Sequence, residues 1–129
     1  MRIVCVDDHP VMLQGLMQNI RQILPDATVC GFHRAEDALA DIRENGCEIL
    51  ISEIELCGIN GLTLAKQVKN CNPQVNIIFH TVCDEKEHAR EVLKIKPSGY
   101  LVKPTKKELL EAELKNLRYC ASETADSHS

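Results

Sequence analysis

Five short apolar segments alternate with longer amphipathic segments along the chain, and this alternation constrains the fold more than any other feature. The longer segments place apolar residues three and four positions apart, as Leu13, Leu16 and Ile20 do, which is typical of helices. A repeat of strand and helix favours a parallel sheet that is covered on both faces. We therefore predict strands over Arg2–Val6, Ala27–Phe32, Ile49–Ser52, Asn76–Thr81 and Gly99–Val102.

The predicted architecture is an α/β fold, a flavodoxin-like (βα)5 doubly wound parallel sheet with strand order 2-1-3-4-5. Right-handed crossovers between parallel strands lead to this order. Residues 1–120 are expected to form the single domain, because a chain of 129 residues can build one core but not two. Residues 121–129 are mainly small and polar, so we expect a tail or linker stub there. The last helix is predicted to run through Leu117.

Glycine and capping patterns mark several predicted helix ends. Gly46 follows the second helix and can adopt the left-handed conformation that ends helices. Asp84-x-x-Glu87 and Thr105-x-x-Glu108 each resemble a capping box, so we expect a helix to begin after Asp84 and another after Thr105.

Composition and charge argue against several classes of protein. The net charge of −4 and the pI near 5.7 argue against direct binding to nucleic acid phosphates by this domain. No apolar run reaches the roughly 20 residues that span a bilayer, and no signal peptide is visible, so we expect a cytoplasmic domain without membrane contact. The seven cysteines form no C-x-x-C pair, which favours reduced thiols. A redox pair of Cys57 and Cys83, which lie in loops at the same predicted sheet end, is the alternative, but a disulfide needs a suitable Cα separation.

Polar side chains stand where four of the predicted strands end. They are Asp7 and Asp8 after the first strand, Glu53 after the third, Thr81 at the end of the fourth and Lys103 after the fifth. Because the carboxyl ends of parallel strands meet at one edge of the sheet, we expect these residues to lie together. Two adjacent acids after an apolar strand are costly unless a cation neutralises them, although acids also cap helices. Taken alone, the threonine could be an ordinary strand residue and the lysine a solvated loop residue.

An acid pair, a carboxylate, a hydroxyl and a lysine in this chain order resemble the receiver domain of bacterial two-component response regulators, over about Arg2–Tyr119. The resemblance implies a magnesium site, a carboxylate that accepts a phosphoryl group from a sensor histidine kinase, and an aromatic switch. It also implies that the Lys103–Pro104 peptide bond is commonly cis. The residues implied are Asp7, Asp8, Glu53 and the backbone carbonyl of Glu55 for Mg²⁺, Glu53 at the phosphoacceptor position, Thr81 and Lys103 around the phosphoryl group, and Thr81 with Tyr100 as the switch.

Three residues depart from the family pattern. Glu53 stands where the family has aspartate, and its extra methylene moves the carboxylate by roughly 1.5 Å. A misplacement of about 1 Å can cost on the order of 100-fold in rate, so Glu53 is expected to be a poor acceptor that instead reaches Lys103. Val82 stands where the family usually has Ala or Gly and is expected to crowd access to the site. Cys57 stands where the family often has Pro.

The sequence therefore predicts a divergent receiver module that is not an enzyme, does not depend on phosphorylation and regulates an output through protein contacts. We expect a transcriptional output domain, dimerisation through the fourth helix, fifth strand and fifth helix, and Mg²⁺ binding no tighter than about 10⁻³ M. The carboxylates of Asp7, Asp8 and Glu53 should repel one another, which draws in a cation or raises one pKa.

There are three alternatives to this function, of which one stays open and two are disfavoured by the residues. A functional Mg²⁺-dependent phosphoreceiver is the main alternative. A Mg²⁺-dependent phosphotransferase of the haloacid dehalogenase type would need an Asp-x-Asp motif, which Val6-Asp7-Asp8 does not supply. A flavin-binding module would need a loop rich in Ser, Thr and Gly after the first strand, and residues 9–12 are not such a loop.

Overall fold

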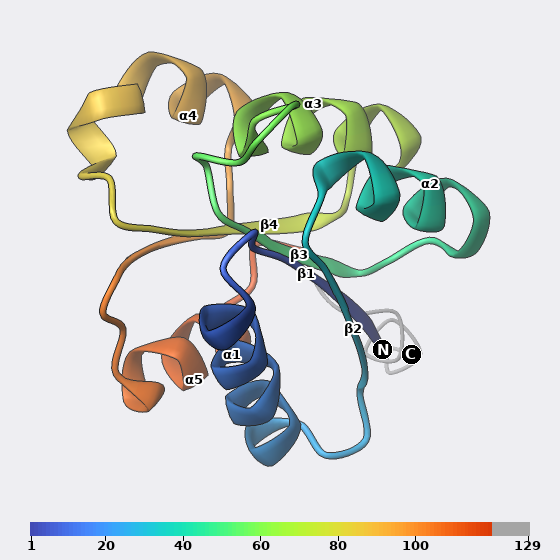
Figure 1. Cartoon of the computed structure of the whole chain (residues 1–129), viewed down its shortest axis with the longest axis vertical. Helices are drawn as coiled ribbons and strands as arrows, with labels where there is room; N and C mark the ends of the chain where they lie inside the picture. Colours follow the sequence, from blue (N-terminus) through green and yellow to red (C-terminus); the bar gives the residue numbers. More distant parts are fainter. Residues whose placement is uncertain (120–129) are drawn as a thin grey trace.

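The computed structural model describes residues 1–119 and contains one five-stranded sheet in which all neighbouring strands are parallel. The strand order 2-1-3-4-5 is the predicted one (Figure 1). Four strands have the predicted bounds, and the second begins at Thr28, one residue later than expected. The strands are β1 (Arg2–Val6), β2 (Thr28–Phe32), β3 (Ile49–Ser52), β4 (Asn76–Thr81) and β5 (Gly99–Val102).

Helices cover both faces of the sheet, as the βα repeat predicts. Figure 1 shows α1 and α5 on one face and α2, α3 and α4 on the other. No helix in the part of the chain that the structure describes is long and apolar enough to cross a membrane. The helices are α1 (Pro10–Ile23), α2 (Ala35–Asn45), α3 (Gly61–Cys71), α4 (Ala89–Ile95) and α5 (Lys107–Lys115), with a 3₁₀ helix, η1 (Glu85–His88), directly before α4.

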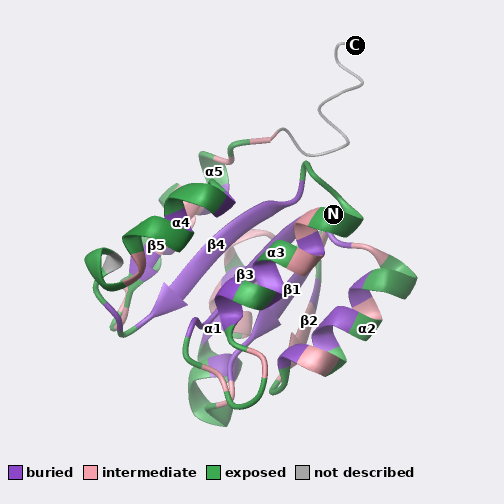
Figure 2. Cartoon of the chain, turned by 90° about the horizontal axis from the view of Figure 1, so that it is seen from above, coloured by how far each residue is buried: buried purple, intermediate pink, exposed green. Residues whose placement is uncertain are grey.

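The core consists of two aliphatic clusters, one on each side of the sheet. Successive residues of a strand face opposite sides, so Ile77 and Phe79 of β4 pack under α2, α3 and α4, whereas Ile78 packs towards α1 and α5. Every residue of β4 is buried, which Figure 2 shows as a continuous purple strand. A strand buried on both faces is fixed firmly, so the residues at its carboxyl end have defined positions.

Two of the predicted helix boundaries are confirmed. Gly46 has φ of +75°, a backbone conformation that favours glycine, and it ends α2. Asp84 and Glu87 form a complete capping box, which opens η1.

Two expectations about α5 are wrong. The residue that caps α5 is Lys106, without a side-chain hydrogen bond, because the Thr105 hydroxyl instead donates to the Val102 carbonyl at 3.1 Å. The helix also ends at Lys115, two residues before Leu117, which is half-buried against the core cluster under α1 and α5. The predicted tail, residues 121–129, lies outside the described residues.

Candidate functional site

The polar residues predicted to lie together do meet at the carboxyl edge of the sheet. Backbone hydrogen bonds extend the ladder one residue beyond the strands and thereby position the site. Glu53 N donates to Val6 O at 3.0 Å, and Lys103 N donates to Thr81 O at 2.8 Å. A cleft of about 590 Å³ opens at this edge, and it is lined by His9, Met12, Glu53, Glu55, Val82, Lys103 and Pro104.

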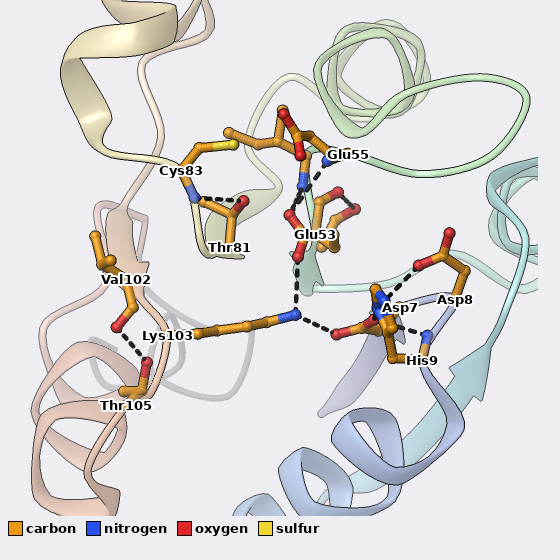
Figure 3. Close-up of polar contacts among 12 residues, drawn as sticks. Asp7, Asp8, His9, Glu53, Glu55, Thr81, Cys83, Val102, Lys103 and Thr105 are labelled. Carbon is orange, nitrogen blue, oxygen red and sulfur yellow. Dashed lines mark hydrogen bonds and ion pairs between the residues drawn. The ribbon is translucent and has the colours of Figure 1, made fainter.

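Lys103 lies at the centre of the site and binds two carboxylates. Its Nζ donates to Asp7 Oδ2 at 2.6 Å and to Glu53 Oε1 at 2.8 Å (Figure 3). The three side chains are between 1% and 5% exposed. The Lys103–Pro104 peptide bond is cis, as the family resemblance implies. The contact between Glu53 and Lys103 confirms that the longer carboxylate reaches the lysine.

Lys103 offsets part of the negative charge of the acids, and the repulsion expected among them does not raise the pKa of Asp7. Burial alone would raise that pKa, but hydrogen bonds from Lys103 and His9 outweigh burial and lower it below its ordinary value. Burial would likewise lower the pKa of Lys103, but the hydrogen bonds and charges of Asp7 and Glu53 raise it. One positive charge beside Asp7 and Glu53 is thus supplied by the protein itself.

The second carboxylate oxygen of Glu53 is also engaged. Oε2 accepts hydrogen bonds from Ile54 N at 2.8 Å and from Glu55 N at 3.2 Å. The loop after β3 turns back here, since Gly61 N donates to Ile54 O at 2.7 Å and a Cβ at Gly61 would collide with the Glu53 carbonyl. Both oxygens of the Glu53 carboxylate are therefore held, one by Lys103 and the other by the backbone amides of its own loop.

His9 is a member of the site that the sequence analysis missed. Its Nδ1 lies 3.1 Å from Asp7 Oδ1 and 3.2 Å from Asp8 Oδ1, and its side chain is 68% exposed. Asp8 Oδ2 accepts from Cys57 N at 3.3 Å. The available signal was the position of His9 directly after the acid pair.

The donor set at this edge suits Mg²⁺ in its chemistry. Asp7, Asp8 and His9 offer ligand atoms within 4.8 Å of one another, and carboxylate oxygens are what Mg²⁺ prefers. Asp8 Oδ1 is buried, and its contact with His9 Nδ1 at 3.2 Å is not a hydrogen bond by its geometry. The oxygens of Asp7 and Glu53, however, already bind Lys103, so a cation would have to compete with its ammonium. The structure places Glu55 at the cleft, and the role of its carbonyl as a ligand stays a prediction.

Thr81 and Tyr100 both form hydrogen bonds with the backbone of Cys83, which lies in the connection between β4 and η1. Thr81 is fully buried, and its Oγ1 accepts from Cys83 N at 3.2 Å. The Tyr100 hydroxyl donates to Cys83 O at 3.0 Å, and its ring lies 6.0 Å from that of Phe79. Tyr100 is thus directed inward, with its hydroxyl on the backbone of the segment after β4. Whether the ring changes its rotamer stays a prediction.

The remaining predicted residues lie at the rim of the site. Val82 lines the cleft and is 64% exposed, so its effect on access stays a prediction. Cys57 is exposed and Cys83 is buried, and both are free thiols, so the alternative of a disulfide between them is not realised.

His80 near the end of β4 is a second residue that the sequence analysis missed. It is 6% exposed, and burial, with a smaller contribution from the charge of Lys103, lowers its pKa to about 4. Its Nδ1 is buried without a hydrogen-bond partner among the described residues. A histidine within an apolar run gave no signal of this environment.

Comparison with known proteins gives a consistent result. The family model for the response regulator receiver domain matches residues 3–115. The response regulator GacA of Pseudomonas viridiflava is 24% identical over 102 residues, which are 79% of this chain and 48% of GacA. The transcriptional regulatory protein ZraR of Salmonella typhimurium is 29% identical over 128 residues, covering 94% of this chain and 28% of ZraR. The chain thus spans about half or less of the length of these relatives.

Solved structures show the same fold. A response regulator receiver domain protein from Clostridium thermocellum superposes with a TM-score of 0.80 at 20% identity, covering 89% of this chain and 91% of that one. A CheY-like receiver domain protein from Methanospirillum hungatei gives a TM-score of 0.81 at 23% identity, covering 88% and 90%.

Proposed function

The chain belongs to the response regulator receiver domain family, and from that premise we propose that it is a divergent receiver that accepts no phosphoryl group and acts through protein contacts. One observation carries this proposal. Both carboxylate oxygens of Glu53 are engaged, one by Lys103 and the other by the amides of Ile54 and Glu55. Neither oxygen of this side chain is without a hydrogen-bond partner, so Glu53 would have to give up contacts to move in line with a phosphoryl donor.

Phosphoryl transfer depends on positioning, which makes this arrangement unfavourable. The attacking oxygen must lie in line with the donor phosphorus, and the lysine must stabilise the charge of the transferred group. For Glu53 to react, it would have to leave Lys103, a separation of charges within a site that is 5% exposed or less. Val82 at the rim of the same cleft adds a branched side chain on the path of a donor.

We infer that Mg²⁺ binds weakly, with a dissociation constant of about 10⁻³ M, because the ammonium of Lys103 already binds two of the acids. Lys103→Ala removes the competitor and should tighten Mg²⁺ binding in a calorimetric titration. Lys107→Ala, an exposed lysine on α5, is the control and should leave the affinity unchanged. Equal Mg²⁺ affinity of the wild type and the Lys103→Ala variant would contradict competition.

The partners proposed for this module follow from the family. Receivers work between a sensor histidine kinase and an output domain, and the relatives GacA and ZraR are named as a response regulator and a transcriptional regulatory protein. We propose an output in transcription, with DNA contacted by another domain, since this chain carries a net charge of −4. We expect the cytoplasm as its location.

Self-association is proposed through the face formed by α4, β5 and α5. This face exposes one large apolar side chain from each element, Leu93 (74% exposed), Val102 (47%) and Leu109 (55%). Tyr100 is directed inward and Lys103 has an anionic partner without any phosphate, so we propose that Glu53 partly favours the active-like state. A carboxylate carries less charge than a phosphoryl group, so the dimer should be weak.

The dimer proposal is tested by Glu53→Gln, which keeps the shape and removes the charge. We expect weaker self-association of this variant in sedimentation velocity. Glu44→Gln, an exposed glutamate on α2, is the matched control and should behave like the wild type. Identical sedimentation of all three proteins would show that Glu53 does not act as a phosphate mimic.

The main experiment for the proposed function is incubation of the wild-type protein with acetyl phosphate and Mg²⁺, followed by intact-mass measurement. We expect no added phosphoryl mass. A stoichiometric, base-labile adduct would instead establish the second candidate function, a functional Mg²⁺-dependent phosphoreceiver. That candidate is favoured by Asp7, Asp8, Thr81 and Lys103, which lie at the same sheet edge.

A further inference from the structure

Three side chains of different chemistry lie close together beyond the carboxyl ends of β3 and β4. They are Glu55 in the loop after β3, Cys83 after β4, and His88 at the end of η1. Each offers one ligand atom, and these atoms all lie within 4.8 Å of one another. Figure 3 shows the sulfur of Cys83 turned towards Glu55 across the gap between their two loops.

Two of the three ligand groups of this cluster have buried atoms, and one of these atoms has no hydrogen-bond partner within the described part of the chain. The Cys83 thiol is 4% exposed and hydrogen-bonds to Glu55; burial, foremost, and this carboxylate raise its pKa. His88 Nε2 is buried and has no hydrogen-bond partner among the residues that the structure describes. A buried polar atom without a partner is rare in proteins and points to a missing partner such as an ion.

We propose that Glu55, Cys83 and His88 form a binding site for a divalent transition-metal ion, with Zn²⁺ as the preferred metal. Thiolate, imidazole and carboxylate are the three ligand types that Zn²⁺ takes, and a water molecule would complete a four-coordinate shell. On binding, the Cys83 thiol gives its proton to solvent and the sulfur forms the bond to the metal. Mg²⁺ prefers oxygen ligands only and would not compete here.

The location of this site connects it to the residues that surround the phosphoacceptor position. Cys83 N donates to Thr81, and Cys83 O accepts from the Tyr100 hydroxyl. A metal held by Cys83, Glu55 and His88 would tie the loop after β3 to the segment after β4 and thereby fix Tyr100 in its inward position. Metal binding would then be an input to the switch that needs no phosphate. Only this regulatory consequence rests on the proposed function, whereas the metal site itself does not.

Other groups in the molecule could bind Zn²⁺ and must be separated from this site. Cys57 and Cys71 are exposed thiols, and Asp7, Asp8 and His9 form the second cluster with metal-ligand spacing. Cys57→Ser and His9→Asn are therefore the matched controls for a thiol and an imidazole outside the proposed site.

The experiment is a Zn²⁺ titration of the reduced protein in competition with a chromophoric chelator. We expect one equivalent to bind, and we expect Cys83→Ser and His88→Gln each to weaken binding by at least about 100-fold, since even loss of a residue behind a metal ligand costs 10–100-fold. Cys57→Ser and His9→Asn should retain wild-type affinity. With Co²⁺ as the probe, a thiolate-to-metal charge-transfer band should appear in the wild type and in Cys57→Ser but not in Cys83→Ser.

Two results would overturn the proposal. One is the absence of stoichiometric Zn²⁺ binding to the wild type. The other is a wrong pattern among the variants, in which Cys83→Ser binds as the wild type does or the control variants lose binding. If a buried variant fails to fold, Glu55→Gln decides instead, because Glu55 is exposed and its substitution leaves the core intact. Zn²⁺ affinity of Glu55→Gln equal to that of the wild type would then count against the site. None of these outcomes depends on whether Glu53 accepts a phosphoryl group.

Discussion

The two ends of the sheet both bury polar groups, but they do so with different chemistry. The carboxyl end buries full charges, Asp7, Glu53 and Lys103. The amino end buries a neutral amide, Asn76, whose Nδ2 donates to Tyr119 O at 3.0 Å and whose Oδ1 accepts from Tyr119 N and Ser98 Oγ, both at 2.8 Å.

This difference separates a site that can change from one that only holds the chain in place. Buried charges can exchange partners with a metal ion or a proton, and each exchange alters the free energy by several kcal/mol. The amide of Asn76 does not titrate, and its partners are backbone groups and a hydroxyl. The site at the carboxyl end should therefore respond to substitution, pH and ions, and the Asn76 cluster at the amino end to substitution alone.

Of the substitutions that compare the two ends, Lys103→Met is expected to lower the stability most. It keeps the apolar stem of the side chain and removes the charge. Asp7 and Glu53 are then left buried without compensation, so the free energy of unfolding should fall by about 3–5 kcal/mol in urea denaturation. Lys115→Met is the control, because Lys115 pairs with Glu111 on the exposed face of α5. A cost for Lys103→Met no greater than that of the control would show that the buried ion pairs do not stabilise the fold.

The second comparison concerns how the stability of the fold depends on pH. At the carboxyl end this dependence rests on His80, whose pKa falls from 6.5 to about 4 on folding. The unfolded chain binds a proton in this interval and the folded one does not, so stability is complete above pH 6.5 and is lost as the pH falls towards 4. The expected loss is about 3 kcal/mol from this residue. The depressed pKa of Asp7 acts in a separate window, below its ordinary value of 3.8.

Urea denaturation of the wild type and His80→Phe between pH 4 and 7 measures the pH-dependent contribution of His80 to the free energy of unfolding. The substitution keeps a buried aromatic ring and removes the titrating group, so the difference in stability between the two proteins should change across the interval. His33→Phe is the control for a histidine that is not buried. A constant difference between wild type and His80→Phe would contradict a neutral buried His80.

The smallest loss of stability is expected for Asn76→Ala at the amino end. The variant leaves the backbone of Tyr119 and the hydroxyl of Ser98 without their partner, which should cost about 1–3 kcal/mol. The cost should be the same at pH 5 and pH 7, because the amide does not titrate. Asn45→Ala, on the exposed end of α2, controls for a general effect of losing an asparagine. A pH-dependent cost of Asn76→Ala would break the contrast between the two ends.

The fold and the edge at which the site lies could be predicted because both follow from periodicity. Parallel strands fix where their carboxyl ends meet, so residues that follow β1, β3 and β5 had to come together. The contact between Glu53 and Lys103 could be predicted from the length of one methylene group. These inferences need only the strand register and the reach of a side chain.

Local competition between hydrogen bonds could not be predicted. The Thr105 hydroxyl donates to the Val102 carbonyl three residues back instead of capping α5. The Thr81 hydroxyl accepts from Cys83 N two residues on, a contact that the sequence did not indicate. The meeting of Glu55, Cys83 and His88 depends on loop dihedral angles that no sequence period specifies. The hydrogen bonds between His9 and Asp7 were missed because they also depend on the conformation of a loop.

The most direct measurement of the central claim compares phosphorylation of the wild type with that of Glu53→Asp combined with Val82→Ala. Aspartate is one methylene shorter, so it should release Lys103, and alanine should open the rim of the cleft. After incubation with acetyl phosphate and Mg²⁺, we expect intact-mass measurement to show the added phosphoryl group on the double variant and none on the wild type. Val82→Ala alone should stay unlabelled. Labelling of the wild type to the same extent as the double variant would contradict the claim that Glu53 and Lys103 have replaced phosphorylation in this receiver.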